Sequence, residues 1–184
     1  MKSPVLANLR VVCAAFLLFA ASTCLGDTLQ RVKDANVLRC GVIDNNRKFS
    51  ELDPDGKWDG YDIAFCQAMS QRLGVTLRVV ALAESRRIDA LALDQSVDVV
   101  VAYPTSATER DSFANHARRV AVTQPYIRLV ANDRSSYASI LTARGDAAML
   151  NWLDMLIWDM VRTGEQAVIF QRYFGYAPPP LRLP

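Results

Sequence analysis

The residues best suited to chemistry follow a short apolar strand, in the stretch "VDVVVAYPTSATERD" at residues 97–111. This stretch breaks at Pro104 into small hydroxyl residues and ends on a charged triplet centred on Arg110. A guanidinium at a strand end can hold a carboxylate in two parallel charge-assisted hydrogen bonds, and nearby hydroxyl and backbone N–H groups can join it. Arg110 could equally be a surface residue paired with Glu109 or Asp111, an ion pair worth under about 1 kcal/mol. The stretch therefore indicates either an anion site or a solvated ion pair.

Other chemistry has little support in the sequence. The single histidine, His116, has no Ser or Cys near it in a nucleophile motif, so no Ser-His or Cys-His nucleophile is predicted. One histidine and the pair Cys40 and Cys66 match no zinc-ligand spacing, and there is no glycine-rich phosphate loop. The formal net charge of +2 does not imply a nucleic-acid partner. We therefore expect a protein that is not an enzyme and that uses no metal and no cofactor.

The first 26 residues have the pattern of a secretory signal peptide. A short basic start precedes an apolar run at residues 11–21, and small residues follow. The run is too short for a transmembrane helix, which needs about 20 residues. We therefore expect export to the periplasm, with Asp27 at the mature N-terminus. Lipid modification at Cys24 is an open alternative.

Export bears on the remaining cysteines, Cys40 and Cys66. In an oxidising compartment an isolated pair is more often bridged than free, and a bridge would stabilise the fold by roughly 3 kcal/mol through loop closure. The pair could instead be two small buried hydrophobic side chains.

Strands and helices alternate on both sides of the arginine stretch. Apolar runs predict strands at 37–43, 75–82 and 97–103, and helical patterns occupy 61–74 and 85–95 after a short helix at 27–33. The helix at 85–95 should place Ile88, Leu91 and Leu93 inward. Strands joined by single helices indicate right-handed crossovers and an α/β fold with a mainly parallel sheet flanked by helices. Ligands in such folds lie beyond the C-terminal strand ends, which points to residues 104–110 and to the loop at 44–60.

The pattern changes after a further strand-like stretch at 120–133. Residues 135–175 look helical, with Gly164 separating two helices. The first of these carries an apolar stripe of Met149, Leu150, Leu153, Leu156, Ile157 and Met160. The proline-rich tail at 176–184 cannot continue a helix and is expected to be extended or disordered.

Three stretches in this order resemble family 3 of the bacterial extracellular solute-binding proteins, the periplasmic amino-acid receptors that serve ABC transporters. Residues 38–80 resemble the opening strand, loop and "G-F-D-x-x-L" helix of the family. Residues 97–111 resemble its "D-hhh-x-x-x-T-x-x-R" segment, and residues 148–175 resemble its closing helices. The resemblance implies one lobe of a type II periplasmic-binding-protein fold plus C-terminal helices. It also implies a strand-helix disulfide between Cys40 and Cys66, as in one branch of the family.

The resemblance gives the candidate site residues their roles. Arg110 would bind the α-carboxylate of the ligand, helped by the backbone and side chains of Tyr103 and Thr105. Phe49 would lie in the loop that lines the cleft. No catalytic or metal-ligating residue is implied.

This chain departs from the family pattern near those residues, and the departures weaken the expected affinity. Ala107 stands where the family has a threonine three residues before the arginine. Asn46 replaces an aromatic residue that would stack on the ligand, and Arg47 and Lys48 replace two prolines.

The second lobe of about ninety residues that the family inserts between two hinge strands has no counterpart here. The expected organisation is a signal peptide at 1–26, a first lobe at 27–133, a shortened connection at 134–144, C-terminal helices at 145–176 and a flexible tail at 177–184. With one wall missing, a bound amino acid would stay partly solvated, so we expect millimolar affinity or none unless a second chain supplies the other wall.

The function expected from these features is weak periplasmic binding of a polar amino acid or similar carboxylate, as the substrate-binding component of an ABC transporter. The partners would be the small ligand, a permease, and a second copy or another periplasmic protein. Alternatively, the lobe is a scaffold for partner binding, like relatives that accompany quinoprotein dehydrogenases. A dehydratase of the kind that shares this fold and a degenerate product without activity also stay open.

Overall fold

Three parallel strands form one half of a six-stranded sheet in the computed structural model, which describes residues 27–102, 120–122, 127–131 and 134–179. β1 (Val37–Ile43) lies between β4 (Thr76–Leu82) and β5 (Val99–Ala102) and runs parallel to both. The valines at 99, 100 and 101 are fully buried, which confirms the predicted strand with two buried faces.

The other half of the sheet is antiparallel. β8 (Arg134–Ala143) pairs with β5 and also with β6 (Val120–Val122) and β7 (Ile127–Ala131). Mixed α/β sheets often carry antiparallel strands beside a parallel set. The strand-like stretch predicted at 120–133 therefore contains two strands that share one long partner.

The prediction of helix from residue 135 is wrong, because residues 134–143 form β8. Helical periodicity begins only at Ala147. Ile140 and Leu141 are both buried and belong to different clusters, one on each face of the sheet. A strand buried on both faces shows no alternation of polar and apolar residues, so its sequence does not separate it from the helix that follows.

Strand order explains why helices cover both faces. α3 (Tyr61–Leu73) connects β1 to β4 on one side, and α4 (Arg87–Ala92), after a 3-10 turn at Glu84–Arg86, connects β4 back past β1 to β5. Crossovers of one hand that run in opposite directions place their helices on opposite faces. The two hydrophobic clusters agree with this, because α3 contributes to one and α4 to the other. Leu93 corrects the prediction for α4, since it lies just past the helix and is 57% exposed.

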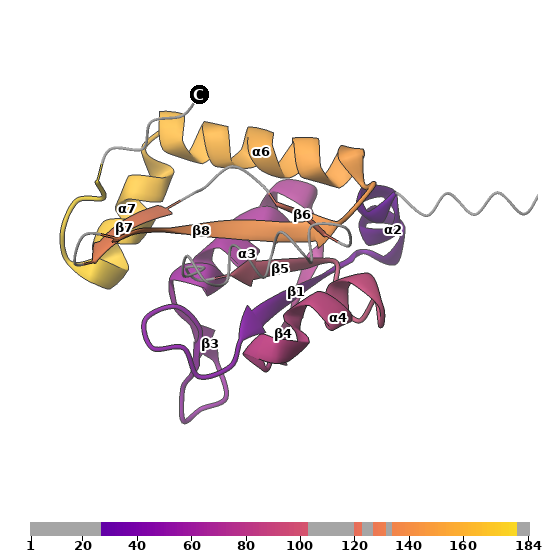
Figure 1. Ribbon diagram of the computed structural model, residues 1–184, viewed down its shortest axis with the longest axis horizontal. Coiled ribbons are helices and arrows are strands. Elements are labelled where there is room, and N and C mark those ends of the chain that lie inside the picture. Colours follow the sequence, from indigo (N-terminus) through magenta and orange to yellow (C-terminus); the bar gives the residue numbers. More distant parts are fainter. Residues whose placement is uncertain (1–26, 103–119, 123–126, 132–133, 180–184) are drawn as a thin grey trace, which may run out of the picture.

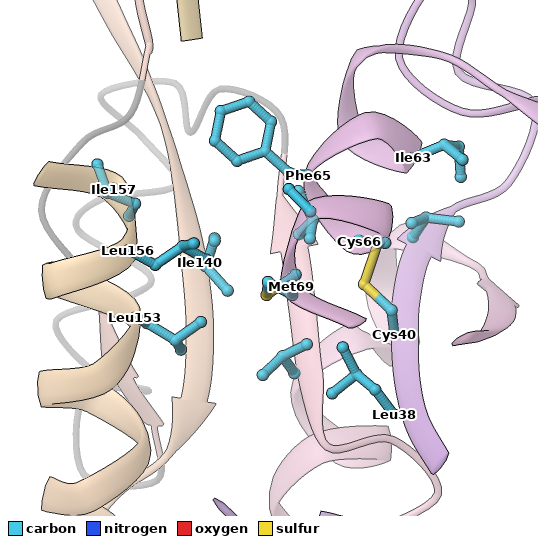
Figure 2. Close-up of a cluster of buried hydrophobic side chains, with 14 of the residues drawn as sticks. Leu38, Cys40, Ile63, Phe65, Cys66, Met69, Ile140, Leu153, Leu156 and Ile157 are labelled. Carbon is cyan, nitrogen blue, oxygen red and sulfur yellow. A yellow bond between two sulfur atoms is a disulfide. The ribbon is translucent and has the colours of Figure 1, made fainter. Parts of the chain in front are cut away.

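The larger cluster is built between the sheet, α3 and the C-terminal helices. α6 (Ala147–Arg162) packs Leu153, Leu156 and Ile157 toward Ile140 of β8, and Phe65 and Met69 of α3 lie on the same side (Figure 2). α7 (Glu165–Phe174) follows α6 after Gly164, as predicted. Burial of this apolar stripe is what holds the C-terminal helices to the lobe.

Asp146 joins the first described helix to the first of the C-terminal helices. Its carboxylate accepts hydrogen bonds from the backbone N–H groups of Met149 and Thr28, both at 3.0 Å. These donors belong to the first turns of α6 and of α2 (Thr28–Ala35), whose N-termini meet there (Figure 1). One buried side chain therefore caps two helices.

A disulfide links β1 to α3. Cys40 and Cys66 form this bond, with Cα atoms 6.0 Å apart and both side chains fully buried (Figure 2). The predicted bridge is therefore present in the fold. No helix among the described residues is long and apolar enough to cross a membrane.

β7 and β8 form a hairpin at the far end of the sheet. Ala131 and Arg134 are register partners, and two residues separate them in the chain. Ala102, the last residue of β5, pairs with Ser139, so β8 begins five residues beyond the end of β5. The hairpin thus projects past the carboxyl end of the parallel strands (Figure 1). The domain boundaries at 133 and 144 stay a prediction.

Candidate ligand-binding site

The candidate site lies at the carboxyl edge of β1 and β5. These strands are parallel neighbours, with Cys40 opposite Val99 and Gly41 opposite Val100. In the order β4-β1-β5, the chain leaves β1 toward one side of the sheet, and β5 is added on the other. In open α/β sheets, ligands bind beyond the strand ends at such a reversal.

The loop after β1 is folded tightly at residues 46–50. The backbone N–H groups of Phe49 and Ser50 donate to the carbonyl of Asn46 at 2.9 and 2.8 Å, and the N–H of Asn46 donates to the carbonyl of Ser50 at 3.0 Å. The Ser50 hydroxyl donates to the carbonyl of Ile43 at 2.5 Å, which ties the loop to the end of β1. These bonds fix the backbone of the loop before any ligand arrives.

The same loop caps the N-terminus of α3. The backbone N–H groups of Tyr61 and Asp62 donate to the carbonyls of Lys48 and Phe49, both at 2.9 Å. A β-carbon on Gly60 would lie 2.2 Å from the Phe49 carbonyl oxygen. Two of the first N–H groups of α3 are therefore satisfied by the loop and are not available to an anion.

Phe49 is positioned by an aromatic cluster that reaches the C-terminal helix. Its ring lies 5.3 Å from that of Phe174 and 6.2 Å, edge to face, from that of Tyr61, and the residue is only 6% exposed. The Lys48 ammonium lies 6.0 Å from the centre of the Phe174 ring. Phe49 thus lies in the predicted loop after β1, and most of its ring is buried in the core. Its contact with a ligand stays a prediction.

Two tyrosines extend this connection between the loop region and α7. The Tyr61 hydroxyl accepts a hydrogen bond from the Gln166 side-chain amide at 3.1 Å, and burial raises the pKa of Tyr61. The Tyr173 hydroxyl donates to Asp59 at 2.7 Å, and its pKa is raised by burial and by that carboxylate. Both phenols stay neutral at physiological pH, so they act here as hydrogen-bonding positioning groups.

A buried guanidinium lies near the carboxyl end of β4. The side chain of Arg87 is 8% exposed, and its Nη1 lies 3.8 Å from a Glu84 carboxylate oxygen. The backbone N–H of Asp44 donates to the Leu82 carbonyl at 3.0 Å, so the ends of β1 and β4 are held together. Arg87 was not among the residues that the sequence singled out. The signal for its burial was its place at the start of a helix that follows a parallel strand.

The charged groups at the amino ends of the strands form a separate network. Asp98 is 3% exposed and accepts from Arg39 through its backbone N–H at 2.8 Å, its Nε at 3.1 Å and its Nη2 at 2.6 Å. Arg31 adds a bond at 3.0 Å. Burial alone would raise the pKa of Asp98, but these hydrogen bonds outweigh it and lower the pKa below its usual value. This network binds α2, β1 and β5 together.

The residues predicted to bind the carboxylate, Tyr103, Thr105 and Arg110, lie outside the described residues, as do the signal segment at 1–26 and Cys24. β5 ends at Ala102, directly before them. β5 therefore ends at the same edge of the sheet as β1, from which the Phe49 loop leaves. Within the described ranges no group of three His, Cys, Asp or Glu side chains could hold a metal ion.

Comparison with solved structures supports the fold. The ancestral cationic amino-acid solute-binding protein AncCDT-1 superposes with a TM-score of 0.71 at 15% identity, over 80% of this chain and 100% of that chain. Domain 1 of TmArgBP from T. maritima, as an arginine-bound Phe57Trp mutant, gives 0.62 at 21% identity, over 73% and 98%. An ancestral cyclohexadienyl dehydratase, AncCDT-3(P188L), gives 0.69 at 13% identity, over 80% and 96%.

No curated protein matches the sequence. The model of one protein family matches residues 38–176, which span the parallel strands, the β7–β8 hairpin and both C-terminal helices. On this match and on its fold, the chain belongs to the bacterial extracellular solute-binding proteins, family 3.

Proposed function

We propose that the protein binds a polar amino acid or a similar small carboxylate at the carboxyl edge of β1 and β5. The observation that carries the proposal is that β1 and β5 are parallel neighbours whose carboxyl ends share one edge of the sheet, the position at which open α/β sheets bind ligands. The ordered Phe49 loop follows β1 at this edge, and the chain continues from β5 into residues 103–110. Arg110 would hold the carboxylate in a forked pair of hydrogen bonds, with Tyr103 and Thr105 beside it.

A single lobe is sufficient for this role in at least one similar protein. Domain 1 of TmArgBP alone is described in an arginine-bound form. An amino acid can therefore be held by one wall, although with fewer contacts and more solvent than between two lobes. For this chain we expect a dissociation constant of about 1 mM, unless a partner closes the site.

The Phe49 loop would supply the wall opposite Arg110. Its backbone is already ordered by hydrogen bonds and by the contact between Phe49 and Phe174, so binding would cost little ordering of that loop. Ligand contact would come from the exposed residues of the loop, Asn45, Arg47 and Lys48, and from the rim of Phe49.

The wider setting follows from the family, whose members are extracellular binding proteins. We place the protein in the periplasm, exported by its first 26 residues, and we assign it to the delivery of ligand to an ABC transporter permease. A binding role is favoured over dehydratase activity because the hydroxyls of Tyr61 and Tyr173 and the carboxylate of Asp98 are held by structural partners.

Ligand titration of the full chain, purified after export, tests the proposal. Chemical-shift changes and calorimetric heats would be measured with arginine, glutamate, cysteine and glycine, and with the carboxamide of each ligand that binds. We expect binding to be lost in the carboxamides and weakened about tenfold or more by Arg110→Ala, because both changes remove the same charge-assisted pair.

Arg78→Ala is the matched control, because Arg78 is an exposed residue of edge strand β4 and its loss changes the net charge equally. It should leave binding unchanged. Binding that ignores Arg110→Ala, or that is equally strong for acid and carboxamide, would overturn the carboxylate assignment.

A further inference from the structure

The outer face of α6 carries a groove that the proposed ligand site does not use. It is lined by Asn151, Asp154, Met155, Trp158, Asp159 and Arg162 and has a volume of about 600 Å³. Met155 is 71% exposed and Trp158 is 44% exposed. Residues 151, 155, 158 and 162 follow the spacing of a single helix face, so this is one continuous stripe with apolar residues at its centre.

Large side chains at the centre of an exposed groove usually mark a binding surface. The apolar face of α6 that stabilises the lobe is the opposite one, formed by Leu153, Leu156 and Ile157. Met155 and Trp158 therefore lie on the face of α6 that points away from the core.

The chain after α7 runs back toward this groove. The Tyr176 ring lies 5.3 Å from that of Phe170 and 6.4 Å from that of Phe174. Tyr176 follows Phe174, so contact with Phe170 means that the chain has reversed at Gly175 and returns along α7. Gly175 has a φ of 81°, which permits such a reversal. The return leads toward the N-terminus of α7, which adjoins the C-terminal end of α6.

The segment beyond the described residues can reach the groove. Residues 177–179 cover about 10 Å when extended, and Phe170 to Glu165 is about 8 Å along α7. Residues 180–184 then span up to about 17 Å, whereas Arg162 to Met155 is about 10 Å along α6. Prolines at 178, 179 and 180 favour an extended conformation.

The chemistry of the segment matches that of the groove. Residues 180–184 read Pro-Leu-Arg-Leu-Pro, which places a cation between two leucines. The groove places an exposed methionine and tryptophan between the carboxylates of Asp154 and Asp159. Hydrogen bonds from Arg162 and Arg72 lower the pKa of Asp159, so its carboxylate is charged at neutral pH.

We propose that residues 180–184 dock on the outer face of α6, with Leu181 and Leu183 against Met155 and Trp158 and with Arg182 beside Asp154 and Asp159.

Oxidation of Met155 tests this docking. The full chain would be treated with dilute hydrogen peroxide, and sulfoxide formation would be followed by peptide mass spectrometry. Met155 is the reporter because Met69, Met149 and Met160 are fully buried. Methionine oxidation follows exposure, so ending the chain after Pro179 should speed oxidation of Met155 about fivefold.

Variants of the full chain test the chemistry of the contact. Leu181→Ser with Leu183→Ser, and separately Arg182→Glu, should each expose Met155, whereas Arg182→Lys should not. If Met69 or Met149 is also oxidised in the shortened chain, the truncation has destabilised the fold. The proposal is then judged from the full-length variants only. Equal Met155 rates in all of these proteins would overturn the proposal. Protection that grows with protein concentration would also overturn it, because the segment would then come from a second copy.

Discussion

Gly60 packs so closely against the loop after β1 that any larger residue at this position would clash with the backbone of the loop. Its φ is 138°, a value reserved for glycine, and a β-carbon would lie 2.2 Å from the Phe49 carbonyl oxygen and 2.9 Å from the Ser50 nitrogen. The neighbouring atoms are backbone, so they cannot move aside as the tip of a side chain would. The ordered conformation of the loop at the candidate site therefore depends on Gly60 having no β-carbon.

Gly60→Ala should lower the free energy of unfolding by about 3 kcal/mol, because it combines backbone strain with displacement of the loop. Urea unfolding followed by circular dichroism would measure this. Gly56→Ala is the control, since Gly56 also has a positive φ of 79° but no heavy atom lies within 4 Å of its β-carbon position. It should cost about 1 kcal/mol. Equal losses for the two variants would show that the contact with Phe49 contributes nothing.

At the scale of single residues, the sequence predicted the disulfide but not the burial of Phe49. Cys40 and Cys66 are bonded as expected, and Phe49 lies in the expected loop. The sequence did not reveal that the Phe49 ring would be buried, because its partner Phe174 is 125 residues away in the chain. A contact at that separation leaves no local pattern.

Among the elements, the link between β1 and α3 joins the two parts of the lobe that border the site. The disulfide closes 26 residues of chain, which include the whole loop after β1. Such a closure restricts the unfolded chain more than the folded one.

Replacing both cysteines by alanine should lower the free energy of unfolding by about 3 kcal/mol. Guanidinium unfolding of the wild type under oxidising and reducing conditions gives a second route to the same quantity. A reduced wild type as stable as the oxidised one would contradict the expectation. The double variant guards against incomplete reduction, because both sulfur atoms are fully buried.

The helices and strands that were predicted correctly are those with a clear local sequence signal, such as a terminal glycine or a short apolar run. α3 ends at Gly74, which has a φ of 67°, and β5 is a short run of valines. β8 was missed because both of its faces are buried at Ile140 and Leu141 and because its residues are mostly small or hydroxylated. Its end could have been found from Asp146, whose side chain accepts from the N–H three residues later, as N-caps do.

For the whole molecule, the network around Asp98 predicts how stability depends on pH. The folded state lowers the pKa of Asp98 below the ordinary value of 3.8. Its contribution is therefore fully present above about pH 4 and is lost as the pH falls through the lower folded value. Acid should destabilise the lobe by protonating this carboxylate between its two arginines.

Asp98→Asn should lower the free energy of unfolding by about 3 kcal/mol at neutral pH, because Arg39 and Arg31 lose a buried partner. Its stability should also fall less steeply than that of the wild type below about pH 4. Urea unfolding across that range would show both effects. The control is Asp94→Asn, which removes an exposed partner of Arg86 and should cost under about 1 kcal/mol. Parallel pH profiles for Asp98→Asn and wild type would exclude this role for Asp98.

The α/β class, the parallel strand set and the packing of the C-terminal helices were all predictable, since they follow from apolar patterns within single elements. The antiparallel half of the sheet was not, because it depends on pairing between strands that have little pattern of their own. The same limit applies to the carboxylate site, where only the position of β5 is described and the arginine lies beyond it.

The β7–β8 hairpin also indicates where the chain could tolerate an added or removed segment. The two strands of the hairpin end at register partners that have only two residues between them in the chain, and the backbones of an antiparallel pair are about 5 Å apart. A segment whose two ends lie that close together could be inserted or removed there without changing the order or the pairing of the strands. An insertion or deletion at this point should therefore leave the sheet of the lobe intact.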